Sequence, residues 1–226
     1  MDRSVPEPGS VADYGDVFAR TTANRLLTAD FLEGLDDEQW QLPTLCEGWD
    51  VRTLAAHLLQ PVRVGFGRFF ITALRYRGDT DRVVDHVARR LARLEPDVII
   101  SELRAHAGDE ISPPRVGPMG PFADICIHLR DMARPLGSAV DAPADDWRLV
   151  LDYLTGPAVA PALVREDVFR GLRLEATDTE WATGQGPRVA GAAEALALAI
   201  TGRREALRDL TGAGADALDA RLRLRS

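Results

Sequence analysis

The spacing of hydrophobic residues predicts a mainly helical region that fills the larger, N-terminal part of the chain. Between residues 12 and 35 apolar positions recur every three or four residues, which is the period of an amphipathic helix. Pro61 interrupts the second predicted helix, so a kink is expected there. The remaining helices are predicted over residues 50–76, 81–94, 96–107, 121–134 and 145–154. Residues 108–121, rich in Pro and Gly, form a long loop of the kind that often carries function.

The pattern changes after residue 160. Residues 170–178 alternate apolar and polar positions, which is typical of a strand, and residues 181–191 predict a second strand entered through a Gly-rich turn. Residues 191–203 predict a helix and residues 216–224 a short helix or strand. We therefore expect an α+β protein with a helical bundle in residues 1–160 and a small α/β domain in residues 161–226.

Composition narrows the class of protein. The chain has 226 residues and 46% of them are hydrophobic, enough for a sizeable core. The 27 basic residues, all Arg, are outnumbered by 35 acidic ones, so nucleic acid and anionic membranes are poor partners. Two cysteines without CxxC spacing argue against a disulfide framework. Since the sequence shows neither a signal-peptide layout nor an apolar run of about 18 residues, a cytoplasmic protein without a transmembrane helix is expected.

Two of the four histidines, His57 and His128, lie among apolar residues and are candidate site residues. Asp124 and His128 are four positions apart on one predicted helix, which places them about 40° apart on one face, and Asp131 falls on the same stripe. Buried polar groups need partners. A divalent metal held by His57, Asp124 and His128, with one position open, is a set of ligands known from catalytic sites in helical bundles.

A purely structural interpretation of the same residues stays open. His57 and His128 would then be core histidines hydrogen-bonded to Asp124, Asp131 and the backbone. Cys46, which precedes the second helix, is interpreted as a half-buried small apolar residue in preference to a member of the site. Two arginines, Arg52 and Arg134, are candidates for binding an anionic substrate or the cofactor at the mouth of the bundle.

The segment LPTLCEGWDVRTLAAHLL, residues 42–59, resembles the second-helix signature of the mycothiol-dependent maleylpyruvate isomerase N-terminal family of the DinB-like superfamily. His57 occupies the position of a metal ligand in that signature. Residues 124–137, DICIHLRDMARPLG, resemble the fourth-helix signature, in which Asp124 and His128 match the other two ligands. Residues 170–203 look like the family's small α/β domain, of the sterol-carrier-protein-like type. The resemblance extends from about residue 12 to residue 222.

The resemblance implies a DinB-like four-helix bundle that holds a divalent metal, Zn²⁺, and uses mycothiol as its thiol co-substrate. The metal-bound thiolate would isomerise a small, anionic, unsaturated acid, or would be transferred to an electrophilic substrate. Asp131 would orient His128, and Arg203 would neutralise a carboxylate of the substrate. The protein is expected to be a monomer or a homodimer.

Two departures from the family pattern keep other functions open. The isomerase has Glu where this chain has the shorter Asp124, and Glu47 stands where the family often has proline. The alternatives are a non-catalytic protein that binds a metal or small molecule, and a metal-dependent hydrolase that uses water in place of the thiol.

Overall fold

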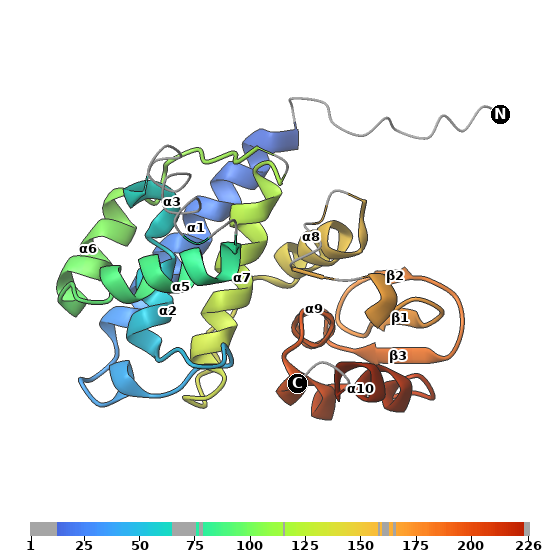
Figure 1. Ribbon diagram of the computed structural model, residues 1–226. Helices are drawn as coiled ribbons and strands as arrows, with labels where there is room; N and C mark the ends of the chain where they lie inside the picture. Colours follow the sequence, from blue (N-terminus) through green and yellow to red (C-terminus); the bar gives the residue numbers. More distant parts are fainter. Residues whose placement is uncertain are drawn as a thin grey trace.

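The helical region predicted from the sequence is present in the computed structural model, which describes residues 13–64, 76, 79–114, 116–157, 159, 163–164 and 166–223. Most of its helices begin and end within a few residues of the predicted positions (Figure 1). They are α1 (Asp13–Glu33), α2 (Val51–His57), α3 (Gln60–Arg63), α5 (Thr80–Leu91), α6 (Pro96–Ala105), α7 (Met119–Ala133) and α8 (Ala144–Thr155), with a 3-10 turn η1 (Gln39–Gln41) before α2.

The predicted kinked helix over residues 50–76 is instead broken before Pro61. Asp50 caps the start of α2, where its side chain accepts a hydrogen bond from the backbone N–H of Thr53 at 2.8 Å. The helix ends at His57 because Pro61 has no N–H to donate and its ring clashes with the carbonyl four residues earlier. Residues 65–75, expected to continue this helix, lie outside the described residues. His57 therefore lies at the C-terminal end of a short helix.

A small mixed sheet forms the C-terminal part of the molecule, with the strand order β2-β1-β3. β1 pairs antiparallel with β2 and parallel with β3, so that Leu174 lies opposite both Thr183 and Val189. The single strand expected over residues 181–191 is two strands, because Gly184 and Gly186 adopt positive φ between them. The elements are β1 (Arg173–Ala176), β2 (Ala182–Thr183), β3 (Arg188–Gly191), the 3-10 turns η2 (Glu166–Val168) and η3 (Arg204–Asp209), and the helices α9 (Ala193–Ile200) and α10 (Ala215–Arg223).

One hydrophobic core runs through both parts of the molecule. Every residue of helix α9 is buried, and all but Glu194 are apolar. The helix lies between α8 and the sheet (Figure 1). Phe122 of α7, Trp147 of α8 and Leu198 of α9 belong to this one cluster of buried side chains. The predicted domain boundary at residues 160 and 161 falls in a segment that is largely outside the described residues, and it stays a prediction.

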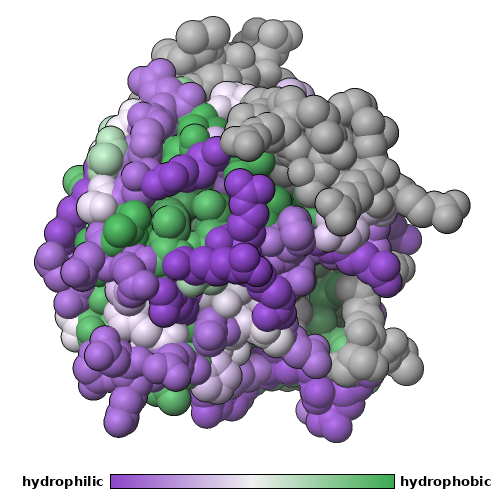
Figure 2. Space-filling view, turned by 60° about the vertical axis from the view of Figure 1, so that its left-hand side comes forward, coloured by the Kyte–Doolittle hydropathy of each residue, from purple (hydrophilic) through white to green (hydrophobic). Residues whose placement is uncertain are grey.

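The surface is mostly polar. On the face shown in Figure 2, hydrophilic side chains surround smaller hydrophobic areas. Among the described residues, the large hydrophobic side chains that are exposed are Leu26, Leu42 and Val98. Within the same part of the chain, none of the helices has the length and hydrophobicity that crossing a membrane requires.

Candidate metal centre

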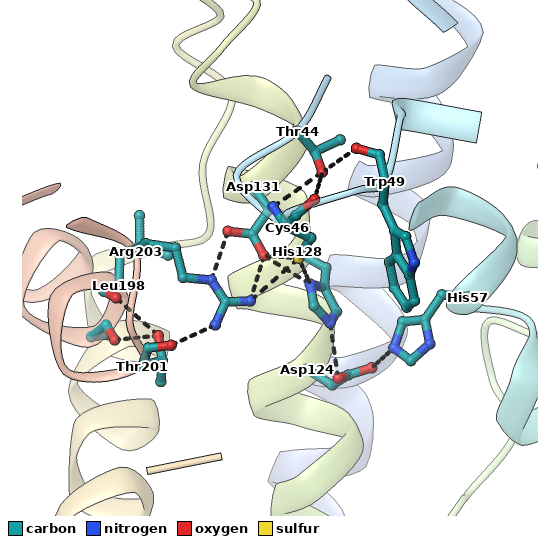
Figure 3. A network of polar contacts seen from close by, with 11 residues as sticks. Thr44, Cys46, Trp49, His57, Asp124, His128, Asp131, Leu198, Thr201 and Arg203 are labelled. Carbon is teal, nitrogen blue, oxygen red and sulfur yellow. Dashed lines mark hydrogen bonds and ion pairs between the residues drawn. The ribbon is translucent and has the colours of Figure 1, made fainter. Parts of the chain in front are cut away.

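The loop between η1 and α2 is fixed against α7 by its own backbone. The Leu45 N–H donates to the carbonyl of Asp131 at 3.0 Å, one of the last carbonyls of α7, which have no partner within the helix. Thr44 Oγ1 accepts a hydrogen bond from the Cys46 N–H at 3.1 Å and donates to the carbonyl of Trp49 at 2.9 Å. These contacts hold the side chains of Cys46 and Trp49 beside α7 (Figure 3).

His57, Asp124 and His128 converge at the centre of the site. Asp124 lies between the two imidazoles, with its Oδ2 3.5 Å from His57 Nε2 and its Oδ1 3.2 Å from His128 Nε2. The two rings are perpendicular, with centroids 5.0 Å apart. His57 and His128 are largely buried, while a third of the Asp124 side chain is exposed. The site is therefore reached by solvent on the side of the carboxylate.

Asp131 is fully buried and binds three side chains from different parts of the chain. Its Oδ2 lies 2.8 Å from His128 Nδ1 and accepts from Cys46 Sγ at 3.1 Å. Arg203, in the turn between α9 and η3, donates through Nε to Oδ1 at 3.0 Å and through Nη2 to Oδ2 at 2.7 Å. The remaining guanidinium nitrogen of Arg203, Nη1, donates to the carbonyl of Thr201 at 2.9 Å. Figure 3 shows this chain of contacts from the C-terminal part to α7.

Each charged side chain in the site stabilises the charged form of its neighbours. Burial by itself would raise the pKa of the Asp131 carboxyl, but Arg203 and His128 hold that pKa well below its usual range. Burial would lower the pKa of His128, yet the neighbouring Asp124, Cys46 and Asp131 raise it well above its usual value. The pKa of Asp124 is held low, against burial, by His128 and His57. Without a bound cation, His128 is thus the positive charge between two carboxylates.

Two overlapping groups have the donor atoms of a metal site within 4.8 Å of one another: His57, Asp124 and His128, and Cys46, His128 and Asp131. Arg203 contacts both Asp131 and Cys46, so a cation in the second group would be repelled by the guanidinium. The first group has no such neighbour among the described side chains that contact it. In the first group His128 would bind the metal through Nε2, while its Nδ1 stays hydrogen-bonded to Asp131. A carboxylate bound to the second nitrogen of a histidine is a common way of orienting a metal ligand. The first group therefore fits a divalent metal.

His57 is positioned by packing instead of by a second hydrogen bond. Its ring lies against that of Trp49, with centroids 5.2 Å apart and planes inclined at 46°. Its Nδ1 is buried and has no hydrogen-bond partner among the residues that the structure describes. The indole N–H of Trp49 in turn donates to Asp85 Oδ1 at 2.8 Å, which fixes the orientation of the ring.

The structure brings five side chains together around α7: Cys46, His57, Asp124, His128 and Asp131, with Arg203 completing the group. All but Cys46 are residues to which the sequence assigned roles in the site. Cys46 is half-buried and packs against the core, as expected, and its thiol also contacts Asp131 and Arg203 of the polar network. Arg203 binds Asp131 and Thr201, so its expected contact with a substrate carboxylate stays a prediction.

The two other arginines assigned to the site lie elsewhere. Arg52 donates to the carbonyl of Leu94 at 2.6 Å. Arg134 binds Glu194 and Asp209 through all three of its nitrogens. Neither guanidinium contacts the group around Asp131 among the contacts of the described residues, and both have protein partners. Their assignment as anion-binding residues stays a prediction without geometric support.

Sequence reasoning missed the part played by Trp49 and Thr44. Both belong to the segment TLCEGW, whose Gly48 has φ +79°, a conformation that permits the tight return of the chain. The position of Trp49 against His57 depends on how this loop folds, and no local pattern in the sequence encodes that path. The sequence signal for this loop was its composition: it contains a threonine, a cysteine and a Gly-Trp pair directly before a capped helix.

Comparison with known proteins agrees with the predicted resemblance. Residues 23–110 match the family described as Mycothiol maleylpyruvate isomerase N-terminal domain, which confirms it for this part of the chain. A crystal structure of the mycothiol-dependent maleylpyruvate isomerase superposes with a TM-score of 0.57 at 14% identity, covering 89% of this chain and 93% of that chain. A histidine-to-alanine mutant of that isomerase gives 0.56 at the same identity and coverage. No curated protein matches the sequence. At this identity the structural likeness shows a shared fold.

Proposed function

We propose that this protein is a metal-dependent enzyme that uses a small thiol, because residues 23–110 match the mycothiol maleylpyruvate isomerase N-terminal domain family. The observation that carries the proposal is the convergence of His57 Nε2, Asp124 and His128 Nε2 in a partly open site. The proposed metal is Zn²⁺, since two imidazoles and a carboxylate are ligands that zinc takes in catalytic sites.

A divalent ion bound there would stabilise the thiolate of a thiol at neutral pH and so make it nucleophilic. Neighbouring side chains position the candidate metal ligands. Asp131 fixes the His128 ring through Nδ1, which leaves Nε2 directed at Asp124. Arg203 holds Asp131 at both oxygens, so the C-terminal part of the chain takes part in orienting His128. Trp49 packs against the ring of His57 and so helps to fix its position.

We propose mycothiol as the thiol and a small unsaturated or electrophilic acid as the substrate. Support comes from the shared fold with the mycothiol-dependent maleylpyruvate isomerase and from the family match. The thiolate would add to a conjugated double bond and leave again after rotation, which isomerises the substrate, or would stay attached, which transfers the thiol. The shorter Asp124 in place of Glu changes the reach of the carboxylate, so the substrate need not be maleylpyruvate.

Metal content of the purified protein, measured by mass spectrometry, tests the site directly. We expect about one divalent ion per chain in the wild type and its loss in the His57→Ala and His128→Ala variants. His106→Ala is the matched control, because this histidine is 39% exposed and pairs with Asp109 away from the site. A wild-type protein that takes up no metal after incubation with zinc would contradict the proposal.

Activity assays then separate the reaction classes. Zinc-loaded protein is incubated with mycothiol and a panel of unsaturated acids and electrophiles, with and without the thiol. Thiol-dependent turnover supports an isomerase or transferase. Turnover that is unchanged without thiol would identify a hydrolase, and metal binding without any turnover would identify a non-catalytic binding protein; both outcomes overturn the thiol-dependent proposal.

A further inference from the structure

A second polar site lies on α5, apart from the metal centre. It is a cavity of about 410 Å³, which we call the arginine pocket. Its volume falls within the roughly 300–1,000 Å³ typical of sites for small molecules. The pocket is lined by Tyr76, Arg82, Asp85, His86, Arg89, Arg90 and Arg93.

Spacing along the helix explains why these side chains gather. Arg82, His86, Arg89 and Arg93 are separated by four, three and four positions, so they follow one face of α5 into the turn after it. Arg89 and Arg90 belong to the last turn of α5, where a positive charge is favourable at the end of the helix dipole. The helix dipole explains the positions of Arg89 and Arg90, but four arginines line the pocket.

Among the residues that the structure describes, the lining of the arginine pocket carries more positive than negative charge. Asp85 is the acidic residue of this described lining, and Arg89 already occupies both oxygens of its carboxylate, at 2.8 and 3.1 Å. Arg82 pairs with Asp79 at 3.3 Å. Arg90 and Arg93 are in no ion pair or side-chain hydrogen bond with any residue that the structure describes. Arg90 lies in the last turn of α5 and Arg93 in the turn that follows the helix, and their like charges repel each other. The rest of the chain is acidic, with a net charge of −8 overall.

Two aromatic rings also line the arginine pocket. Tyr76 and His86 place their rings 5.6 Å apart, inclined at 45°, so an aromatic surface lines the same pocket as Arg90 and Arg93. Guanidinium groups bind carboxylates and phosphates through pairs of parallel hydrogen bonds, and a ring surface accepts the organic part of a ligand. The lining therefore suits a ligand that combines negative charge with a small carbon skeleton.

We propose that the arginine pocket binds a small organic anion with at least two negative charges, a phosphate ester or a dicarboxylate. Arg90 and Arg93 bind the anionic group, and Tyr76 and His86 contact the rest of the ligand. This site is separate from the metal centre, since it shares none of its lining residues with it. The two sites are linked through Asp85, which accepts hydrogen bonds from both Arg89 and the indole of Trp49.

Calorimetric titration of the full chain at low ionic strength tests the proposal, with pyrophosphate and succinate as separate probes. We expect saturable binding of at least one probe, weakened at least tenfold in the Arg90→Gln/Arg93→Gln double variant, since each charged hydrogen bond contributes roughly a factor of ten or more. The matched control is Arg148→Gln/Arg223→Gln, which removes two exposed arginines on α8 and α10 and should change affinity less than twofold. Thermal unfolding of each variant verifies that it is folded.

Each outcome of the calorimetric titration either supports or overturns the proposal. Tighter binding of pyrophosphate assigns the pocket to phosphate esters and tighter binding of succinate to dicarboxylates; either supports the proposal. Equal weakening in both double variants would show only general attraction of anions, and absence of saturable binding in the wild type would show no site; either overturns it. Binding should persist in His57→Ala, so this result does not depend on whether the metal centre is active.

Discussion

Asp131 is the residue on which the arrangement of the site depends most. It is completely buried and carries a negative charge, which is costly unless every neighbouring group compensates it. Arg203 supplies the balancing charge, and His128 and Cys46 take up the remaining acceptor positions. A change of this one side chain should therefore affect both folding and metal binding.

Asp131→Asn keeps the shape of the side chain and removes its charge. We expect the free energy of unfolding to fall by about 3–5 kcal/mol, because Arg203 remains buried without a counter-charge. Zinc affinity should fall about 10- to 100-fold, because His128 loses the carboxylate that orients it. Urea unfolding and zinc titration against a chelator measure the two effects. Asp219→Asn, which alters an exposed ion pair with Arg223, is the control and should change neither quantity appreciably; unchanged zinc affinity in Asp131→Asn would contradict the role given to this residue.

Asp141 gives the stability of the protein a distinct dependence on pH. Burial raises the pKa of its carboxyl to about 6, although Arg130 and the indole N–H of Trp147 act in the opposite direction. A carboxyl whose pKa is higher in the folded than in the unfolded state holds its proton better when folded. Its contribution to stability is therefore lost as pH rises from about 4 to about 6.

Asp141→Asn should remove this dependence, since asparagine keeps the oxygen that accepts from Trp147. We expect the variant to match the wild type near pH 4 and to be more stable by about 1–2 kcal/mol at pH 7.5, with allowance for the third of the side chain that is exposed. Urea unfolding at the two pH values is the measurement. A variant that is less stable than the wild type at pH 7.5 would show that the charge of Asp141 is favourable.

The sequence predicted which side chains converge on α7 better than it predicted the residues that surround them. Asp124 and His128 lie on one helix, so their spacing alone placed them on a common face. Cys46 and Trp49 belong to a loop whose path depends on contacts with α7, and no local pattern encodes that path. For the same reason the sequence did not predict the contact of Arg203 with Asp131.

At the scale of elements, α2 shows how a short helix carries a site residue. It has two turns, too few to be stable alone, and its start depends on the cap by Asp50 and on the pairing of Asp50 with Pro43 in the preceding loop. The sequence predicted the positions of most helices, including the start of α2 at about residue 50. It did not predict that the helix ends at His57, because the effect of Pro61 was expected to be a kink.

Asp50→Ala removes the cap and should lower the free energy of unfolding by about 1 kcal/mol. Because α2 carries His57, we also expect a measurable loss of zinc affinity. Asp79→Ala is the matched control: it removes the cap of α5, where Asp79 accepts from the Arg82 N–H at 3.2 Å, and should affect stability without affecting zinc. Zinc titration and urea unfolding of both variants decide the matter, and equal effects on zinc would show that the position of His57 does not depend on the start of α2.

At the scale of the whole molecule, Glu194 joins the helical and C-terminal parts through charge. It lies buried on α9 and accepts hydrogen bonds from Arg130 at 2.8 Å and from Arg134 at 2.6 Å, both at the end of α7. This contact and the one between Arg203 and Asp131 both connect the C-terminal part to α7. The helix that carries two candidate ligands is thus held from both parts of the chain.

Glu194→Gln should lower the free energy of unfolding by about 3 kcal/mol, because two largely buried arginines lose their common counter-charge. Thermal and urea unfolding measure the effect. Glu175→Gln, which changes an exposed pair with Arg188 in the sheet, is the control and should have little effect. If both variants behave alike, the charge of Glu194 does not contribute to holding the two parts of the molecule together.

The contact between Arg203 and Cys46 joins residues 157 positions apart in the chain. Contacts of such long separation form slowly, because the entropy of the intervening chain must be lost before they contribute. Helices such as α1 and α7 can form early from local contacts, but His128 is held in its final orientation only when the turn after α9 has docked. We expect the site to mature late in folding, so that a metal ion captured by a nascent chain would exchange freely until the last part of the chain is in place.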